Sequence, residues 1–289
     1  MRRETLRWVL GGLWLLDGLL QLQPAMFTMA MVQGVMQPAT AGNPSWVNIP
    51  LEYAIRVFSH HIAVANAGVA AIQLTIGLSL LLAGRRRWPY ALSLAWALLL
   101  WPFGQAFGDL LSGSASLWTG APGSAVLYAL LTWAAWPSPG DAATEQRRGW
   151  LRLTLGGLWA LGALLQTNRA FFTGQGLAAL VSGNIPGQPV WMAALLAGTS
   201  HALSARPVLY NAVAIGLLAA LALGIWSGRW SAQALALSIL VSVVAWVPGQ
   251  AFGGLLTGMG TDPNTAPLLA LLALSVWPPR ADDRSRAAA

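Results

Sequence analysis

Long apolar runs separated by short polar segments extend along almost the whole chain. Most runs are roughly 20 residues long, the length at which an α-helix crosses the hydrocarbon core of a membrane. Four runs lie in the first half of the chain and four in the second. They cover residues 7–28, 62–83, 89–111, 122–136, 152–173, 207–227, 232–256 and 264–278. The pattern predicts an all-α integral membrane protein with about eight transmembrane helices.

The second half repeats the first at a spacing of 145 positions, since GQAFGDLLSG starts at Gly104 and GQAFGGLLTG at Gly249 (249 − 104 = 145). The same spacing matches Trp14 with Trp159, Asn66 with Asn211, Trp101 with Trp246 and Pro122 with Pro267. Each half holds an even number of runs, so we expect two parallel four-helix repeats. Residues 1–137 form the first repeat, 138–149 a cytoplasmic linker, and 150–289 the second repeat with a short polar C-terminal tail.

The segment between the first and second apolar runs is long in both halves. It covers residues 29–61 in the first half and 174–206 in the second, and each segment contains more than one proline. Neither segment has an apolar run of spanning length. We therefore expect both to be partly helical and to lie at the membrane surface.

Composition supports a membrane protein and excludes several other classes. Charged residues make up 9% of the 289 residues and hydrophobic residues 56%, whereas soluble domains carry roughly 25% charged residues. The chain has no cysteine, which excludes disulfides and thiolate chemistry. A Walker motif and an HExxH motif are absent from the sequence, so catalysis of the soluble type is not expected.

The basic residues indicate an orientation in the membrane rather than nucleic-acid binding. All 16 are arginines, and they lie in short clusters between the apolar runs. Only Arg56, Arg169 and Arg206 fall on one side of the predicted topology, which leaves 16 − 3 = 13 on the other. By the positive-inside rule, we expect a multi-pass protein of the bacterial cytoplasmic (inner) membrane with both termini in the cytoplasm.

Amides and carboxylates inside the apolar runs are the candidate binding residues. An unpaired buried amide costs roughly 1–3 kcal/mol, so each needs a partner, a water molecule or a ligand. These residues are Asp17, Gln21, Gln105, Asp109, Gln166 and Gln250. The i, i+4 spacing of Asp17 with Gln21, and of Gln105 with Asp109, predicts that each pair shares a helix face. Together they predict a polar cavity that opens to the non-cytoplasmic side.

The two halves differ in their acidic residues. Asp17 corresponds to Gly162, and Asp109 corresponds to Gly254. The amides, by contrast, are present in both halves. We interpret the amides mainly as contacts between helices, and the two aspartates as the better functional candidates. The glycines of GQAFG have GxxxG spacing, which predicts close packing between helices.

A second candidate site lies among the polar residues on the outer side. Arg56 and His61 are five residues apart, and so are His201 and Arg206. These four residues fit an anion or proton site, or contacts with lipid headgroups. Two histidines that face each other across helices would also suit a haem, which is a further alternative.

Methionines are concentrated in one outer segment. They are Met26, Met29, Met31 and Met36. Thioether sulfurs suit Cu(I), but methionine also fills irregular apolar contacts. We assign no metal site here, and copper stays an open alternative.

Two stretches carry a resemblance to a known family. RWVLGGLWLLDGLLQLQP (Arg7–Pro24) and the run Asn66–Leu100 resemble the DoxX/DoxD-like group of small four-helix bacterial membrane proteins. The resemblance implies that the chain is a fused pair of such units. It also implies a quinone-linked or accessory role in a redox complex. No functional residue is carried over from the family.

These observations favour a membrane-embedded binding or accessory subunit. Its expected partners are the lipid bilayer, a quinone or other lipophilic small molecule, and redox partner subunits. The alternatives are a transporter for a small solute, proton or metal ion, and a non-catalytic membrane scaffold. The residues assign no enzyme class and no cofactor.

Overall fold

The computed structural model describes residues 1–82, 84–138 and 140–278, and this part of the chain is helical without strands. Four helical segments are long and apolar enough to cross a membrane. They are Ser45–Leu82, Trp88–Asp109, Pro207–Trp226 and Ser231–Thr257. An all-helical fold with several apolar helices is therefore confirmed. The expected C-terminal tail lies mostly at residues 279–289, outside the described residues.

The first half packs four long helices side by side. They are α1 (Arg3–Leu20), α3 (Ser45–Leu82), α4 (Trp88–Gln105) and α5 (Ser124–Ala135). Helix α1 packs against α3 and α5, and α4 packs against both α3 and α5. Trp14 of α1 is fully buried at the centre of this group.

Four helices of the second half make a corresponding set of contacts. Its helices are α6 (Asp141–Leu165), α9 (Pro207–Trp226), α10 (Ser231–Trp246) and α11 (Thr265–Ser275). Helix α6 packs against α9 and α11, and α10 packs against α9 and α11. Contacts between α5 and α11 join the two halves. The start of α6 lies within the expected linker, so that linker is mostly helical.

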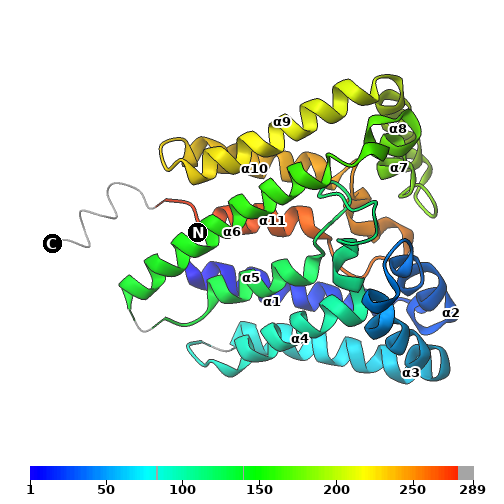
Figure 1. Ribbon diagram of the computed structural model, residues 1–289. Helices are drawn as coiled ribbons and strands as arrows, with labels where there is room; N and C mark the ends of the chain where they lie inside the picture. Colours follow the sequence, from blue (N-terminus) through cyan, green and yellow to red (C-terminus); the bar gives the residue numbers. More distant parts are fainter. Residues whose placement is uncertain (83, 139, 279–289) are drawn as a thin grey trace.

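Short helices gather at one end of the molecule (Figure 1). They include α2 (Met29–Met31), α7 (Gly174–Ser182) and α8 (Val190–Ala205), so residues 29–61 and 174–206 are partly helical as expected. Helix α3 loses helical geometry at His61, and helical geometry is likewise interrupted at Arg206, between α8 and α9. These two positions are 206 − 61 = 145 residues apart.

Several buried hydrogen bonds recur at the same spacing. The indole Nε1 of Trp14 donates to Ser93 Oγ (2.9 Å), and that of Trp159 donates to Ser238 Oγ (2.9 Å). Asn66 and Asn211 also form equivalent bonds, to the carbonyl oxygens of Gln21 (2.7 Å) and Gln166 (3.0 Å).

The spacing changes before the last helix of each half. The Trp101 indole donates to the carbonyl of Pro122 (2.8 Å), and the Trp246 indole donates to the carbonyl of Pro263 (2.7 Å). The structural counterpart of Pro122 is therefore Pro263, and the expected match with Pro267 is wrong. Because 263 − 122 = 141, the second half lacks four residues in this connection.

The repeated GQAFG is not a helical GxxxG motif. Helix α4 ends at Gln105, and Ala106–Asp109 (η4) all have positive φ. The corresponding η6 (Ala251–Thr257) also has positive φ at its first four residues. Gly108 lies against the Pro122 carbonyl, where a Cβ atom would collide. Left-handed geometry and this close backbone approach explain why glycine stands here.

Arginines line a groove at the opposite end of the molecule, where Figure 1 places the N-terminus. The groove has a volume of about 950 Å³, and its lining includes Arg2, Arg3, Arg147 and Arg148. Arg7 reaches the last turn of α3 and donates to the carbonyls of Leu80 (2.5 Å) and Leu81 (2.7 Å). These carbonyls lack helical partners, so Arg7 caps the helix.

Candidate functional site

A cavity in two parts lies near the end that carries the short helices. One part is lined mainly by α1, α3, α4 and α5, and the other by η4 and the connections 114–123 and 261–264. A polar chamber of about 290 Å³ and an aromatic chamber of about 170 Å³ adjoin each other. Six residues line both chambers, namely Val35, Gly104, Gln105, Ser124, Thr261 and Asp262. We therefore treat the two chambers as one cavity, which consists mainly of first-half residues.

The aromatic chamber combines rings, thioethers and buried polar groups. Trp14 and Tyr128 form one wall with ring centroids 4.3 Å apart. Trp96 from α4, together with Met31 and Met36 from the short-helix segment, adds further apolar surface. Such a lining suits a flat or branched apolar group.

Five polar atoms on residues that line this chamber have no hydrogen-bond partner among the residues that the structure describes. They are Asp17 Oδ1, Gln21 Oε1, Gln73 Oε1, Tyr128 OH and Trp96 Nε1. The side chains of Asp17, Gln21, Gln73 and Tyr128 are at most 4% exposed. The Tyr128 hydroxyl lies near Asp17 without a hydrogen bond of normal geometry. Buried polar groups are nearly always paired, so this chamber contains unused hydrogen-bonding capacity.

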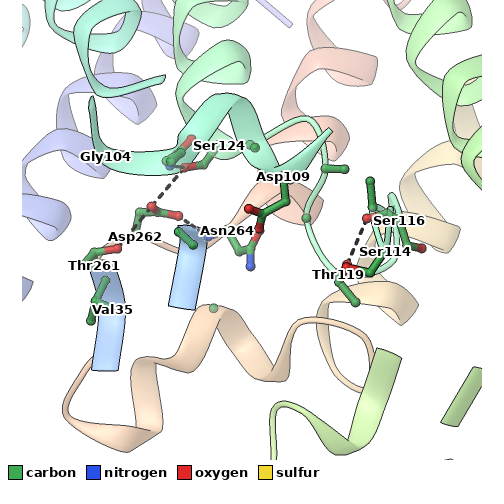
Figure 2. A pocket seen from close by; sticks show the side chains of 18 residues that line it. Val35, Gly104, Asp109, Ser114, Ser116, Thr119, Ser124, Thr261, Asp262 and Asn264 are labelled. Atoms are coloured by element: carbon green, nitrogen blue, oxygen red, sulfur yellow. Dashed lines mark hydrogen bonds between the residues drawn. The ribbon is translucent and has the colours of Figure 1, made fainter. Parts of the chain in front are cut away.

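Asp262 adds a third carboxylate, which enters from the second half. Its Oδ2 accepts from Ser124 Oγ (3.0 Å), and its Oδ1 accepts from the backbone N–H of Asn264 (2.6 Å). Figure 2 shows Ser124 and Asp262 pointing toward each other. Burial raises the pKa of Asp262, and the hydrogen bonds from Asn264, Ser124 and Thr261 oppose that shift.

Sequence reasoning missed Asp262 because the 145-residue spacing was extended past the four-residue gap. The corrected spacing of 141 places Asp262 opposite Ala121. It is therefore a third acid, after Asp17 and Asp109, that has no acidic counterpart in the other half. An alignment that allowed one gap would have revealed this signal.

Gln105 and Gln250 hold the starts of the following helices. Gln105 Oε1 accepts from Ala125 N–H (3.1 Å), and its Nε2 donates to Ser124 Oγ (2.7 Å). Gln250 bonds Ala266 N–H (2.9 Å) and Thr265 Oγ1 (2.8 Å) in the same way. The interpretation of these amides as contacts between structural elements is confirmed. Gln105 also lines both chambers, and the assignment of the two amides as ligand-binding groups stays a prediction.

Asp109 lies in the polar chamber, but not on a helix face with Gln105. It follows the end of α4 and has a φ of 57°. Asn43 Nδ2 lies 3.4 Å from its Oδ1. Asp109 is half-buried and remains a candidate, while the expected i, i+4 pairing with Gln105 is wrong.

The arginine and histidine candidates do not join the cavity. Arg56, His61, His201 and Arg206 are all exposed, and none of them lines either chamber. His61 lies beside His60, with ring centroids 6.4 Å apart on the same helix. Within residues 1–82, 84–138 and 140–278, no group of three or more His, Cys, Asp or Glu side chains could hold a metal ion.

The methionines mainly provide packing. Met26, Met31 and Met36 are buried in one apolar cluster with Val47 and Leu51. Met29 is 41% exposed and is not part of that cluster. The cluster matches the role of methionine as an adaptable apolar filler.

Gln166 belongs to the second half and lines neither chamber. It is fully buried, and its Oε1 accepts a hydrogen bond from Ser116 Oγ (2.9 Å), a residue that lines the polar chamber. Its Nε2 has no partner among the described residues. The oxygen of this amide is therefore paired and its nitrogen is not.

Comparisons with known proteins add no family to these observations. No protein-family model, no curated protein and no solved structure matches the chain. The resemblance to DoxX/DoxD-like proteins therefore remains a proposal, and the function has to be argued from the cavity.

Proposed function

We propose that this protein is a multi-pass membrane protein that binds a small lipophilic molecule with a polar head in its first-half cavity. The observation that supports this most directly is the set of five unpartnered polar atoms around the aromatic chamber. A buried polar group without a partner costs about 1–3 kcal/mol. A ligand that pairs with several of them would recover much of that cost.

The arrangement of donors and acceptors fits a quinone or quinol head. Tyr128 and Trp96 supply donors for a quinone carbonyl, and Asp17, Gln21 and Gln73 supply acceptors for a quinol hydroxyl. The tryptophan and tyrosine rings offer faces for stacking. The aromatic chamber of about 170 Å³ is smaller than the roughly 300–1,000 Å³ of typical ligand sites, and the adjoining polar chamber adds about 290 Å³.

We further propose two parallel four-helix repeats with eight spans in the bacterial cytoplasmic membrane. The recurring bonds of Trp14 and Trp159, and of Asn66 and Asn211, support the repeats. The groove lined by arginines lies at the end opposite the short helices (Figure 1). By the positive-inside rule this end is cytoplasmic, and the cavity belongs to the outer side.

Quinone binding without cysteine chemistry suits an accessory subunit that works with redox partner subunits. This role agrees with the resemblance to DoxX/DoxD-like proteins. Transport is the weaker alternative, because the groove and the cavity share no lining residue. A pure scaffold does not account for the unpartnered groups.

Binding of duroquinone, an uncharged tetramethyl benzoquinone, tests the proposal. Full-length protein in lipid nanodiscs is equilibrated with duroquinone by dialysis, and empty nanodiscs give the background from lipid. We expect saturable binding of one molecule per chain, and mass spectrometry of an organic extract is expected to find a native lipophilic ligand. Binding that does not exceed the lipid background would contradict the proposal.

A further inference from the structure

The groove at the arginine-lined end of the molecule receives charge from both halves of the chain. The start of α1 contributes Arg2 and Arg3, and the first part of α6 contributes Arg147 and Arg148. The spacing of the two pairs is again 145 residues, since 147 − 2 = 145 and 148 − 3 = 145. The two halves therefore supply one groove with arginine pairs from equivalent positions.

The described lining of this groove does not balance its charge. None of the described residues that line it is acidic. Arg148 pairs with Glu145 (2.9 Å), whose side chain is 67% exposed, and such surface pairs contribute little. Burial and, to a lesser degree, repulsion from Arg3 lower the pKa of Arg147, which lies outside the predicted spans. The two arginine pairs are thus near enough to repel each other.

The position of Arg2 and Arg3 adds to this repulsion. Both lie at the N-terminal end of α1, where the helix dipole disfavours positive charge and favours an anion. Glu4 lies in the same turn, but it is exposed and does not line the groove. Guanidinium groups bind phosphate oxygens through two parallel hydrogen bonds. The groove therefore suits an anion with phosphate groups.

The lining of the groove also includes apolar side chains from four helices. Leu6 of α1 and Leu151 of α6 are each 3% exposed and stand at equivalent positions. Ile239 of α10 and Leu274 of α11 extend this apolar surface. The volume of about 950 Å³ is close to the upper end of the roughly 300–1,000 Å³ of typical ligand sites. A ligand with acyl chains can lie against this surface while its head meets the arginines.

We propose that the groove binds a phospholipid that carries two phosphate groups, such as diphosphatidylglycerol. One phosphate pairs with Arg2 and Arg3, and the other pairs with Arg147 and Arg148. Basic pockets between helices at the cytoplasmic side of a membrane are typical sites for such head groups. The inference rests on insertion of the chain in a membrane and not on quinone binding, because the groove and the cavity share no lining residue.

Native mass spectrometry of lipid binding tests the inference. Full-length protein is delipidated in detergent and titrated with diphosphatidylglycerol, or with phosphatidylglycerol, which has one phosphate, at equal phosphate concentration. The variant Arg3→Gln/Arg148→Gln removes one arginine of each pair. The control Arg85→Gln/Arg229→Gln removes the same charge from exposed residues of the α3–α4 and α9–α10 connections, which do not line the groove.

We expect the wild type to bind one diphosphatidylglycerol per chain at concentrations roughly tenfold or more below those that phosphatidylglycerol requires, because the two phosphates are linked. Arg3→Gln/Arg148→Gln should weaken this binding roughly tenfold or more, and the control should bind as the wild type does. Equal losses in the two variants, or equal binding of the two lipids, would overturn the inference. Unchanged binding by the groove variant would also overturn it, and would favour the acidic tail residues Asp282 and Asp283 as counter-ions.

A charge-preserving variant separates the effect of charge from an effect on folding. Arg3→Lys/Arg148→Lys keeps both charges without the guanidinium geometry, so it should bind diphosphatidylglycerol more tightly than the glutamine variant does. Binding as weak as that of the glutamine variant would contradict the inference.

Thermal unfolding of the wild type supplies a test that needs no variant. Diphosphatidylglycerol should raise the unfolding midpoint more than phosphatidylglycerol does, because a ligand that binds only the folded state stabilises it. Equal rises would overturn the inference. Duroquinone binding should be the same in every variant of the groove, so the failure of one proposal can be distinguished from the failure of the other.

Discussion

Replacing Tyr128 with phenylalanine separates the binding role of its hydroxyl from its packing role. Tyr128 is 2% exposed, its ring packs against Trp14, and its hydroxyl lies near Asp17 without a hydrogen bond of normal geometry. Tyr128→Phe keeps the ring and removes only the oxygen. An unsatisfied buried hydroxyl costs about 1–3 kcal/mol, so the ligand-free variant is expected to be as stable as the wild type, or more stable by up to ~1 kcal/mol.

The same substitution should weaken ligand binding. Loss of one hydrogen bond between the protein and its ligand costs about 0.5–1.5 kcal/mol, which raises the Kd for duroquinone roughly 2- to 12-fold. Tyr90→Phe is the matched control, because Tyr90 is also fully buried with an unpartnered hydroxyl but lines neither chamber. Thermal unfolding gives the stability, and dialysis in nanodiscs gives the Kd. The reasoning is refuted if both variants bind duroquinone equally well.

Three further predictions concern the elements that position the cavity. Gly108→Ala should lower the stability of the fold by roughly 3 kcal/mol or more, because it combines a positive φ with a collision against Pro122. Gly113→Ala, at a positive φ in open space, should lower it by about 1–2 kcal/mol. Equal losses for the two variants in thermal unfolding would contradict this. Gln250→Met should lower the stability by about 1–3 kcal/mol, because the Ala266 N–H loses its buried acceptor. Gln105→Met should lower it by less, because Gln105 is half-buried and water can take the place of its amide oxygen. Burial raises the pKa of Asp262 above 3.8, so between that value and the raised pKa the folded state retains a proton that the unfolded state has lost. The stability of the wild type should therefore fall as pH rises from about 4 toward the raised pKa, and Asp262→Asn should flatten this fall. Parallel pH profiles of stability for the two proteins would argue against it.

The helices of the cavity walls could be predicted from the sequence because their signals are local or repeated. Apolar runs identified the main helices, and the 145-residue spacing matched Trp14 with Trp159, whose indoles form equivalent hydrogen bonds in the structure. Asp17 and Gln21 do line one chamber, as their i, i+4 spacing suggested. Burial and periodicity follow from the local sequence, so these elements required no knowledge of distant contacts.

The connections between helices could not be predicted in the same way. The residues of GQAFG have no local feature that forbids a continued helix, and the left-handed turn packs against Pro122 in the connection that precedes α5. Asp262 reaches across to the opposite half of the protein. Its place in the cavity was hidden by a four-residue gap in a segment of weak similarity, where an ungapped match to Pro267 concealed the change of spacing.

Photolabelling with an azidoquinone tests the central claim most directly, because it reports where the ligand lies. Full-length protein in nanodiscs is irradiated with the probe, and labelled peptides are identified by mass spectrometry with and without excess duroquinone. We predict one label per chain at saturation, located on first-half peptides that contain residues of the aromatic chamber, and removed by duroquinone. Labels spread over lipid-facing residues of both halves, or labels that duroquinone does not reduce, would contradict the account.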